Sequence, residues 1–99
     1  MNIQAMMKQA QKMQHEMQKT KEEIDKKIFP GKYSMVEVEV NGKKELQKVT
    51  IDKSMELDKD NIELLEDMLL VAVNDALKKV DVETEQKMGK YASGLTGLL

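Results

Sequence analysis

The feature that most constrains this sequence is a long heptad pattern at its N-terminus. From Asn2 to about Lys27 the chain contains no Gly and no Pro, which predicts one uninterrupted amphipathic helix. Its apolar residues follow alternating steps of three and four, broken only by Thr20. They are Ile3, Met6, Ala10, Met13, Met17 and Ile24. A strict seven-residue register is typical of a seam between two helices rather than of a broad face on a globular core.

The opposite face of this helix carries a basic stripe. Its members are Lys8, Lys12, His15, Lys19 and Lys26. Within residues 1–21, four lysines face a single acid, Glu16. A charged face opposite an apolar seam is usually only solvated surface, but a cluster of one sign also suits a polyanion. Both interpretations stay open at this point.

The middle of the chain predicts a small antiparallel sheet. Phe29, Pro30 and Gly31 end the first helix and lead into a short extended piece. Residues 33–40 then alternate apolar and polar side chains, with the exception of Met35, which predicts a half-buried strand. Asn41-Gly42 predicts a type I′ hairpin, because both residues tolerate a positive φ, and residues 46–51 supply the returning strand.

A second long helix is predicted after an acidic connection. Asp60 and Glu63 suggest a capping box, and the helix is expected from Asn61 to about Met88, closed by Gly89. Its main apolar stripe is Ile62, Leu65, Leu69, Ala72, Val73, Ala76 and Val80. A second stripe on roughly the far side is Leu64, Met68 and Val71. One small sheet cannot cover both stripes.

These elements predict a single α+β domain over residues 1–99, with residues 92–99 as a flexible tail. Its parts are a long N-terminal helix, a small antiparallel sheet with an Asn-Gly hairpin, and a long C-terminal helix. Uncovered apolar surface in so small a chain favours a homodimer. The expected interface residues are Leu64, Met68 and Val71 with Met13 and Met17.

Composition argues against several classes of function. The 99 residues include no Cys and a single His, so neither thiol chemistry nor a metal-binding set is expected. No nucleophile motif or phosphate-binding loop is present, and we expect neither an enzyme, a cofactor nor a small-molecule substrate. No segment approaches the roughly 20 apolar residues of a membrane span. We therefore expect a cytoplasmic protein without a membrane partner.

Five segments resemble one bacterial protein family. They are residues 7–14 (MKQAQKMQ), 38–42 (VEVNG), 49–55 (VTIDKSM), 65–68 with 71–76 (LEDM, VAVNDA) and 87–90 (KMGK). In this order they resemble the YbaB/EbfC family of nucleoid-associated proteins. The resemblance implies a tweezer-like homodimer in the nucleoid that binds DNA and influences nucleoid organisation and gene expression. It implies neither a cofactor nor catalysis.

The resemblance supplies no DNA-contact motif, so the candidate DNA-binding residues rest on geometry. They are Lys8, Lys12 and Lys19 on the first helix, and Lys78, Lys79, Lys87 and Lys90 near the end of the second. Every basic residue is Lys, which favours phosphate contacts over the bidentate reading of bases by Arg. The alternative function is a non-enzymatic interaction module that docks a partner through its Met-rich helical seam.

Overall fold

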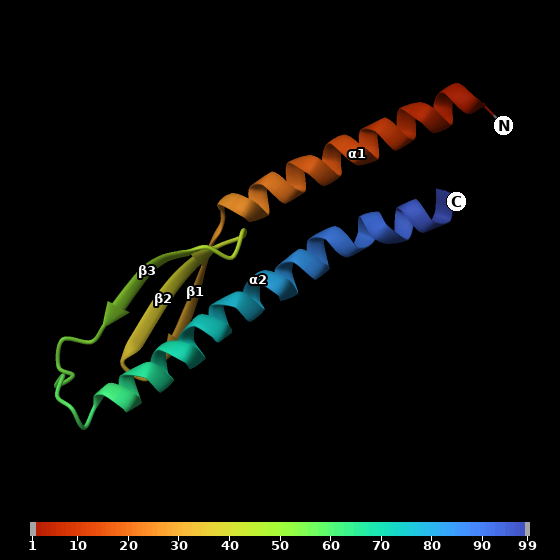
Figure 1. The fold of residues 1–99 in the computed structure, drawn as a ribbon. Helices are drawn as coiled ribbons and strands as arrows, with labels where there is room; N and C mark the ends of the chain where they lie inside the picture. The colour runs from red at the N-terminus through yellow and green to blue at the C-terminus, as the bar shows by residue number, and fades with distance from the viewer. Residues whose placement is uncertain (1, 99) are drawn as a thin grey trace.

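A computed structural model describes residues 2–98 of the chain and the side chains of residues 2–91. The elements are α1 (Ile3–Lys26), β1 (Ile28–Tyr33), β2 (Val36–Asn41), β3 (Leu46–Ile51) and α2 (Ile62–Leu98) (Figure 1). The strands form an antiparallel sheet in the order β1-β2-β3. The predicted α+β class is therefore confirmed.

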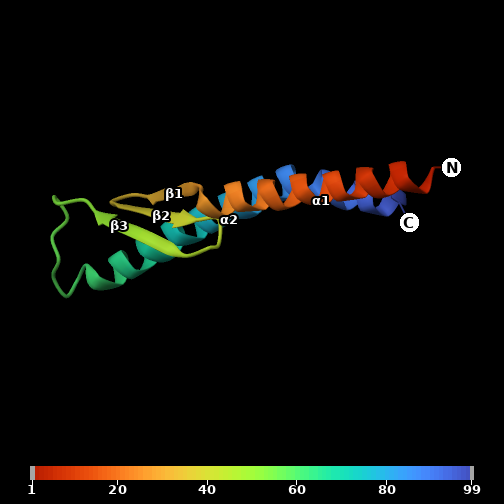
Figure 2. The same cartoon turned by 90° about the horizontal axis from the view of Figure 1, so that it is seen from above.

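The molecule is long and thin because both helices extend beyond the sheet. Its principal extents are 71 × 19 × 13 Å. The two helices run antiparallel, so that the N-terminus and the end of α2 lie at the same end of the molecule (Figure 1). Seen from above, α1 continues in line beyond the sheet, over the C-terminal half of α2 (Figure 2). The sheet and the loop after it occupy the other end.

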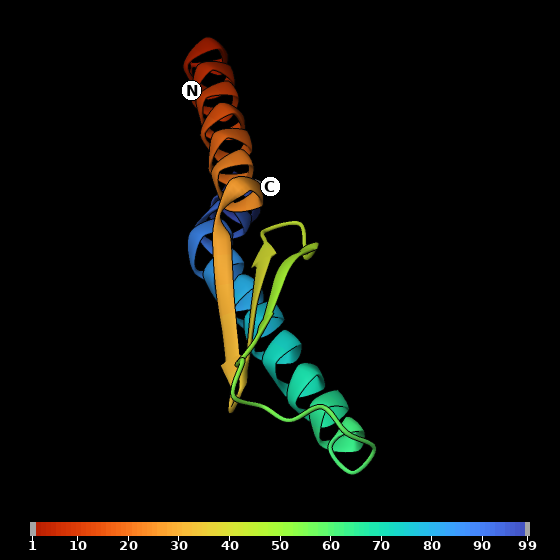
Figure 3. The same cartoon turned by 90° about the vertical axis from the view of Figure 1, so that its left-hand side faces the viewer.

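The core lies between α2 and the first two strands. Val36, Val38 and Val40 of β2 are at most 1% exposed, and they face buried residues of α2. These helix residues are Met68, Ala72, Ala76 and Val80. Figure 3, which views the molecule from the end that carries the sheet, shows the three strands side by side with α2 crossing behind them. The helix packs against β1 and β2, whereas β3 remains largely exposed along its length.

Small residues bring β1 unusually close to α2. A Cβ atom at Gly31 would overlap the carbonyl oxygen of Ala72 and approach the Cβ of Ala76. Gly31 is therefore required by the close approach of two backbones, and Ala72 and Ala76 supply the flat surface on the helix. Larger residues at these positions would separate the sheet from the helix on which it packs.

The seam of α1 has its helical partner in the same chain. Ile24 is 4% exposed, and the hydroxyl groups of Thr20 and Tyr91 are 3.1 Å apart. Met13 and Met17, further along the seam, are partly buried. Thr20, the one polar residue of the heptad pattern, thus marks a side-chain hydrogen bond between the two helices.

The strand predicted over residues 33–40 begins later than expected, at Val36. Tyr33 ends β1, and a tight turn at Ser34 and Met35 precedes β2. Ser34 has a φ of 53°. The phase of the strand was correct, since Val36, Val38 and Val40 all face the core.

The hairpin is confirmed, but the prediction of a type I′ turn was wrong. The N–H of Asn41 donates to the carbonyl oxygen of Glu45 at 3.0 Å, which leaves residues 42–44 as a three-residue loop. The positive φ, 64°, belongs to Lys44 rather than to Asn41 or Gly42. Gly42 is needed for proximity instead, because a Cβ there would overlap the carbonyl group of Ile24 at the end of α1. Its N–H donates to the carbonyl oxygen of Asp25 at 3.3 Å.

The start of α2 was predicted to within one residue, whereas its predicted capping residue and its predicted end were wrong. The helix begins at Ile62, and the side chain of Asp58, rather than that of Asp60, accepts hydrogen bonds from the chain just before it. Gly89 does not end the helix, which continues to Leu98 because no proline follows. The flexible tail expected over residues 92–99 stays a prediction, because residue 99 and the side chains of residues 92–98 lie outside the described part of the chain.

Replacing Gly31 by Ala should destabilise the fold by about 1–3 kcal/mol, because the added methyl group forces α2 away from β1. Gly89→Ala is the matched control. A Cβ there meets no described atom within 4 Å, so the change should stabilise the helix by up to about 1 kcal/mol. Urea unfolding measures both, and equal stability of the two variants would contradict the close approach.

Candidate nucleic-acid interface

Three lysines of α1 form an unobstructed basic surface. Lys8, Lys12 and Lys19 are exposed, and none forms an ion pair with a described residue. At 1.5 Å per residue they span about 16 Å along the helix axis. That length corresponds to about five base pairs at roughly 3.4 Å each, so the three ammonium groups match the length of a short run of DNA phosphates.

The candidate lysines of α2 differ from these in their surroundings. Lys79 donates to the carbonyl oxygen of Pro30 at 2.8 Å and pairs with Asp75 at 3.4 Å. Lys87 pairs with Glu83 at 3.5 Å. Lys78 and Lys90 form no ion pair with a described residue. Lys79 and Lys87 are therefore partly neutralised, and binding a phosphate would require them to leave acidic partners.

One groove brings lysines of both helices together. Lys12 of α1 and Lys90 of α2 line a hollow of about 360 Å³ between the helices. Its other lining residues are Gln9, Met13, Glu16 and Tyr91. The ammonium group of Lys90 lies 5.0 Å from the centre of the Tyr91 ring, which is itself 6% exposed. Lys90 thus extends the basic surface of α1 across the groove, whereas Lys78 and Lys79 lie about three helical turns closer to the N-terminal end of α2.

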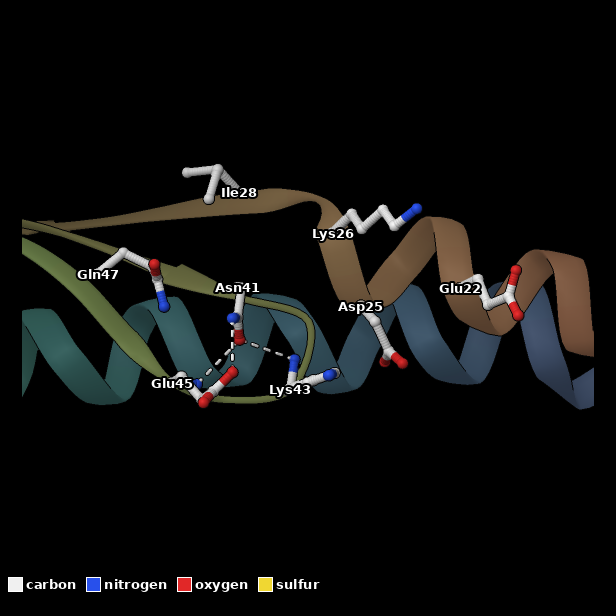
Figure 4. Close-up of a pocket in the computed structure, with 8 residues that line it drawn as sticks. All are labelled: Glu22, Asp25, Lys26, Ile28, Asn41, Lys43, Glu45 and Gln47. Atoms are coloured by element: carbon white, nitrogen blue, oxygen red, sulfur yellow. Dashed lines mark hydrogen bonds between the residues drawn. The ribbon is translucent and has the colours of Figure 1, made fainter.

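A second polar groove is less suited to an anion. It lies where the C-terminal end of α1 meets the β2–β3 hairpin and has a volume of about 620 Å³ (Figure 4). Glu22, Asp25 and Glu45 contribute carboxylates, whereas Lys26 and Lys43 contribute the opposite charge. Within the described residues no three His, Asp or Glu side chains group so as to hold a metal ion.

An ion pair that sequence reasoning missed fixes the base of α1. Lys27, the residue after the last helical turn, donates to the carboxylate of Glu83 on α2. Its ammonium group also lies 5.4 Å from the centre of the Phe29 ring. The hydrogen bond from Lys27 holds the pKa of Glu83 below its ordinary value of 4.5. No local pattern could reveal this pair, because the two residues are 56 positions apart.

The residues predicted for a dimer interface do not form one surface. Met68 is 5% exposed and belongs to the core of the single chain, because this side of α2 faces the sheet. Leu64 and Val71 are 49% and 43% exposed. Val71 precedes Asp75 by one helical turn, so both lie on the β1 side of α2. Met13 and Met17 lie on the seam of α1, away from this flank.

Comparisons with known proteins relate this chain to a DNA-binding family. Residues 1–95 match the model of the YbaB/EbfC DNA-binding family. The chain is 45% identical over 97 residues to a nucleoid-associated protein of Lactococcus lactis subsp. cremoris, covering 96% of this chain and 97% of that protein. A nucleoid-associated protein of Ligilactobacillus salivarius is 39% identical over 100 residues, covering 99% and 95%.

A crystal structure of an uncharacterized Helicobacter pylori protein has the same fold. It superposes with a TM-score of 0.69 at 26% identity, covering 87% of this chain and 91% of that one. The fold and the family match therefore place this chain among small α+β DNA-binding proteins. The chain belongs to the YbaB/EbfC DNA-binding family. Within the described residues, neither helix has the length and apolar character that a membrane crossing requires.

Replacing Glu83 by Gln should lower the free energy of unfolding by up to about 1 kcal/mol at pH 7, because the pair with Lys27 is lost from a side chain only 19% exposed. A carboxyl with a lowered folded pKa stabilises the protein above its unfolded pKa. This contribution is lost as the pH falls through the folded pKa, which lies below 4.5.

The two proteins should therefore converge in stability as the pH falls from 4.5 through the lowered pKa of Glu83. Urea unfolding between pH 7 and pH 3 measures this convergence, with the exposed Glu85→Gln as the control. A stability difference between Glu83→Gln and the parent that does not change with pH would contradict the role of the charged pair.

Proposed function

We propose that this chain is a nucleoid-associated protein that binds duplex DNA as a homodimer, acts in the nucleoid, and influences nucleoid organisation and gene expression. Membership of a DNA-binding family supports DNA as the ligand. The names of the Lactococcus and Ligilactobacillus relatives support the location. The observation that carries the mode of binding is the unpaired stripe of Lys8, Lys12 and Lys19 on α1.

The chemistry of the stripe favours phosphate contacts. Lysine presents a compact charge on a flexible stem, whereas the bidentate recognition of guanine is mainly a property of arginine. The chain contains no arginine. Binding should consequently depend strongly on salt and weakly on DNA sequence.

The arrangement of charge along the molecule orients it on DNA. The net charge is −2, so total charge does not draw the protein to a polyanion. Residues 52–67, at the end of the molecule opposite the N-terminus, contain seven acids and two lysines (Figure 1). This acidic end is repelled by DNA, whereas the lysines of α1 lie far from it. The protein should therefore approach DNA with α1.

Exposed apolar side chains support the homodimer. Leu64 and Val71 lie on one flank of α2, and Leu70, 63% exposed, lies on the other. Leaving large apolar side chains in water on both flanks of one helix is unfavourable, and a second copy is the simplest means of covering them. The tweezer shape of the dimer stays a prediction.

The alternative function, an interaction module, is favoured by the apolar tip of α1. Ile3 and Met7 are 71% and 57% exposed. In that case a partner helix would dock on the seam of α1, and the lysines would serve only solubility.

Changing Lys8, Lys12 and Lys19 to Gln should weaken binding to duplex DNA while preserving the fold, because Gln keeps the helix propensity and leaves the seam intact. If a dimer places six lysines near phosphates, the logarithm of the affinity should fall with the logarithm of salt with a slope of about −5. The triple variant should show a much shallower slope. A mobility-shift titration against random duplex DNA at several salt concentrations measures both quantities.

Lys43, Lys53 and Lys59 provide the matched control, because they are exposed and form no ion pair with a described residue. Changing them to Gln removes the same charge from the other parts of the molecule. Equal loss of affinity in both triple variants would show that only net charge matters. Absence of DNA binding by the parent at low salt would favour the interaction module.

A further inference from the structure

His15 fills the wider of the two gaps between the unpaired lysines of α1. Along the helix axis Lys8 and Lys12 are about 6 Å apart, whereas Lys12 and Lys19 are about 10 Å apart, at roughly 1.5 Å per residue. His15 follows Lys12 by three residues and precedes Lys19 by four, so the three side chains share one face of the helix. His15 is exposed and forms no ion pair with a described residue.

The side chain of His15 borders a hollow on the basic face of α1. The hollow has a volume of about 240 Å³ and is lined by His15, Gln18, Lys19 and Glu22. All four residues belong to α1, and all four are exposed. One water molecule occupies roughly 30 Å³ in the liquid, so the hollow has room for a phosphate group together with water. A ligand can enter it directly from solvent.

The donors around the hollow suit the oxygen atoms of a phosphodiester. The ammonium group of Lys19 and the side-chain amide of Gln18 are both groups that contact phosphates in DNA complexes. A neutral imidazole has one N–H donor and one nitrogen that only accepts, whereas a protonated imidazole donates from both nitrogens. Protonation of His15 therefore removes a lone pair that would face the phosphate and adds a positive charge.

The charged groups around His15 all belong to α1. Lys12 and Lys19 lie within about one helical turn of it, and Glu22 is the one acid that lines the hollow. Glu16 lines the groove on the α2 side instead. No described residue of another element lines the hollow. With a neutral imidazole the charges of Lys19 and Glu22 cancel, and protonation of His15 makes the hollow positive.

We propose that this hollow binds a phosphate group of the DNA backbone and that protonation of His15 strengthens the binding. The inference rests on the DNA binding of the proposed function and adds a contact residue that makes it depend on pH. Imidazole is the side-chain type whose charge ordinarily changes between about pH 5 and pH 8, and the chain contains one His and no Cys. DNA binding should therefore take up protons, and the affinity should rise as the pH falls.

Titration of random duplex DNA at about pH 6 and about pH 8, at constant ionic strength, tests the site. The parent should bind several-fold more tightly at the lower pH. His15→Gln is neutral at both pH values and should bind as weakly as the parent does at the higher pH. His15→Lys is cationic at both and should bind as tightly as the parent does at the lower pH.

The salt dependence gives a second readout that a purely structural role of His15 would not change. The slope of the logarithm of the affinity against the logarithm of salt should steepen by about 0.9 for each His15 that contacts a phosphate. This steepening should occur in the parent between the higher and the lower pH and should be absent in His15→Gln. Gln and Lys both favour a helix at least as well as His, so circular dichroism should show an unchanged helix content.

Moving the imidazole elsewhere in the chain is the matched control. Lys53 is exposed in the acidic end of the molecule, residues 52–67. Adding Lys53→His to His15→Gln restores one imidazole per chain, but far from the hollow. This double variant should respond to pH as His15→Gln alone does. Recovery of the parent's pH dependence would show that an imidazole at any position suffices and would overturn the site.

Glu22→Gln tests the hollow independently of the imidazole. Removing the acid that lines the hollow should raise the affinity for DNA several-fold at both pH values, because the phosphate no longer meets a carboxylate. Glu23→Gln removes the same charge from the next residue, which is exposed and does not line the hollow. Its effect should be smaller, and equal effects of the two changes would contradict the assigned site.

The titrations separate the failure of this inference from that of the proposed function. DNA binding by the parent with the same pH dependence as His15→Gln would overturn the phosphate site and leave the proposed function in place. Absence of DNA binding by the parent at low salt, at either pH, would overturn both. A parent that binds more tightly at the lower pH, with His15→Gln insensitive to pH, is the result that the inference predicts.

Discussion

The close contact of β1 with α2 is the constraint on which the rest of the structure depends. Gly31 brings the strand against Ala72 and Ala76, and this contact seats β1 and β2 on the helix while leaving β3 outside its reach. The same contact places Lys79 and Asp75 beside the outer edge of β1. The need for a residue without a side chain at position 31 thus determines which edge of the sheet α2 protects and which edge it leaves uncovered.

The placement of α1 follows from a second set of contacts at its base. Gly42 lies against the last turn of the helix, Lys27 pairs with Glu83, and Ile24 is buried. These contacts lie at one end of α1, whereas Lys8 and Lys12 lie toward the other. The helix therefore presents its lysines away from the acidic loop, and this separation of charge allows a chain with a net charge of −2 to bind a polyanion.

The periodicity of the sequence was enough to predict both helices, the phase of β2 and the hairpin, because burial on one face leaves a repeating pattern. It could not decide which apolar stripe of α2 faces the sheet, and Met68 was assigned to the wrong surface for that reason. Pro30 and Gly31 resembled chain breakers, but an edge strand tolerates a proline whose missing N–H would point outward. Gly42 was assigned a conformational role, whereas its actual constraint is a contact with distant residues.

In the candidate site, the positions of the lysines could be predicted from the sequence, but their ion-pair partners could not. The stripe of Lys8, Lys12 and Lys19 is local to one helix and is visible in the spacing alone. Lys79 and Lys87 have partners that depend on tertiary packing or on which of several nearby acids is chosen. The sequence therefore could not separate lysines in ion pairs from lysines free to bind a ligand.

Lysine acetylation of the native protein, with and without duplex DNA and quantified by mass spectrometry, tests the central claim most directly. Our account predicts that DNA protects Lys8, Lys12 and Lys19 while Lys53 and Lys59 react as before, and equal protection of all five lysines, or of none, would contradict it.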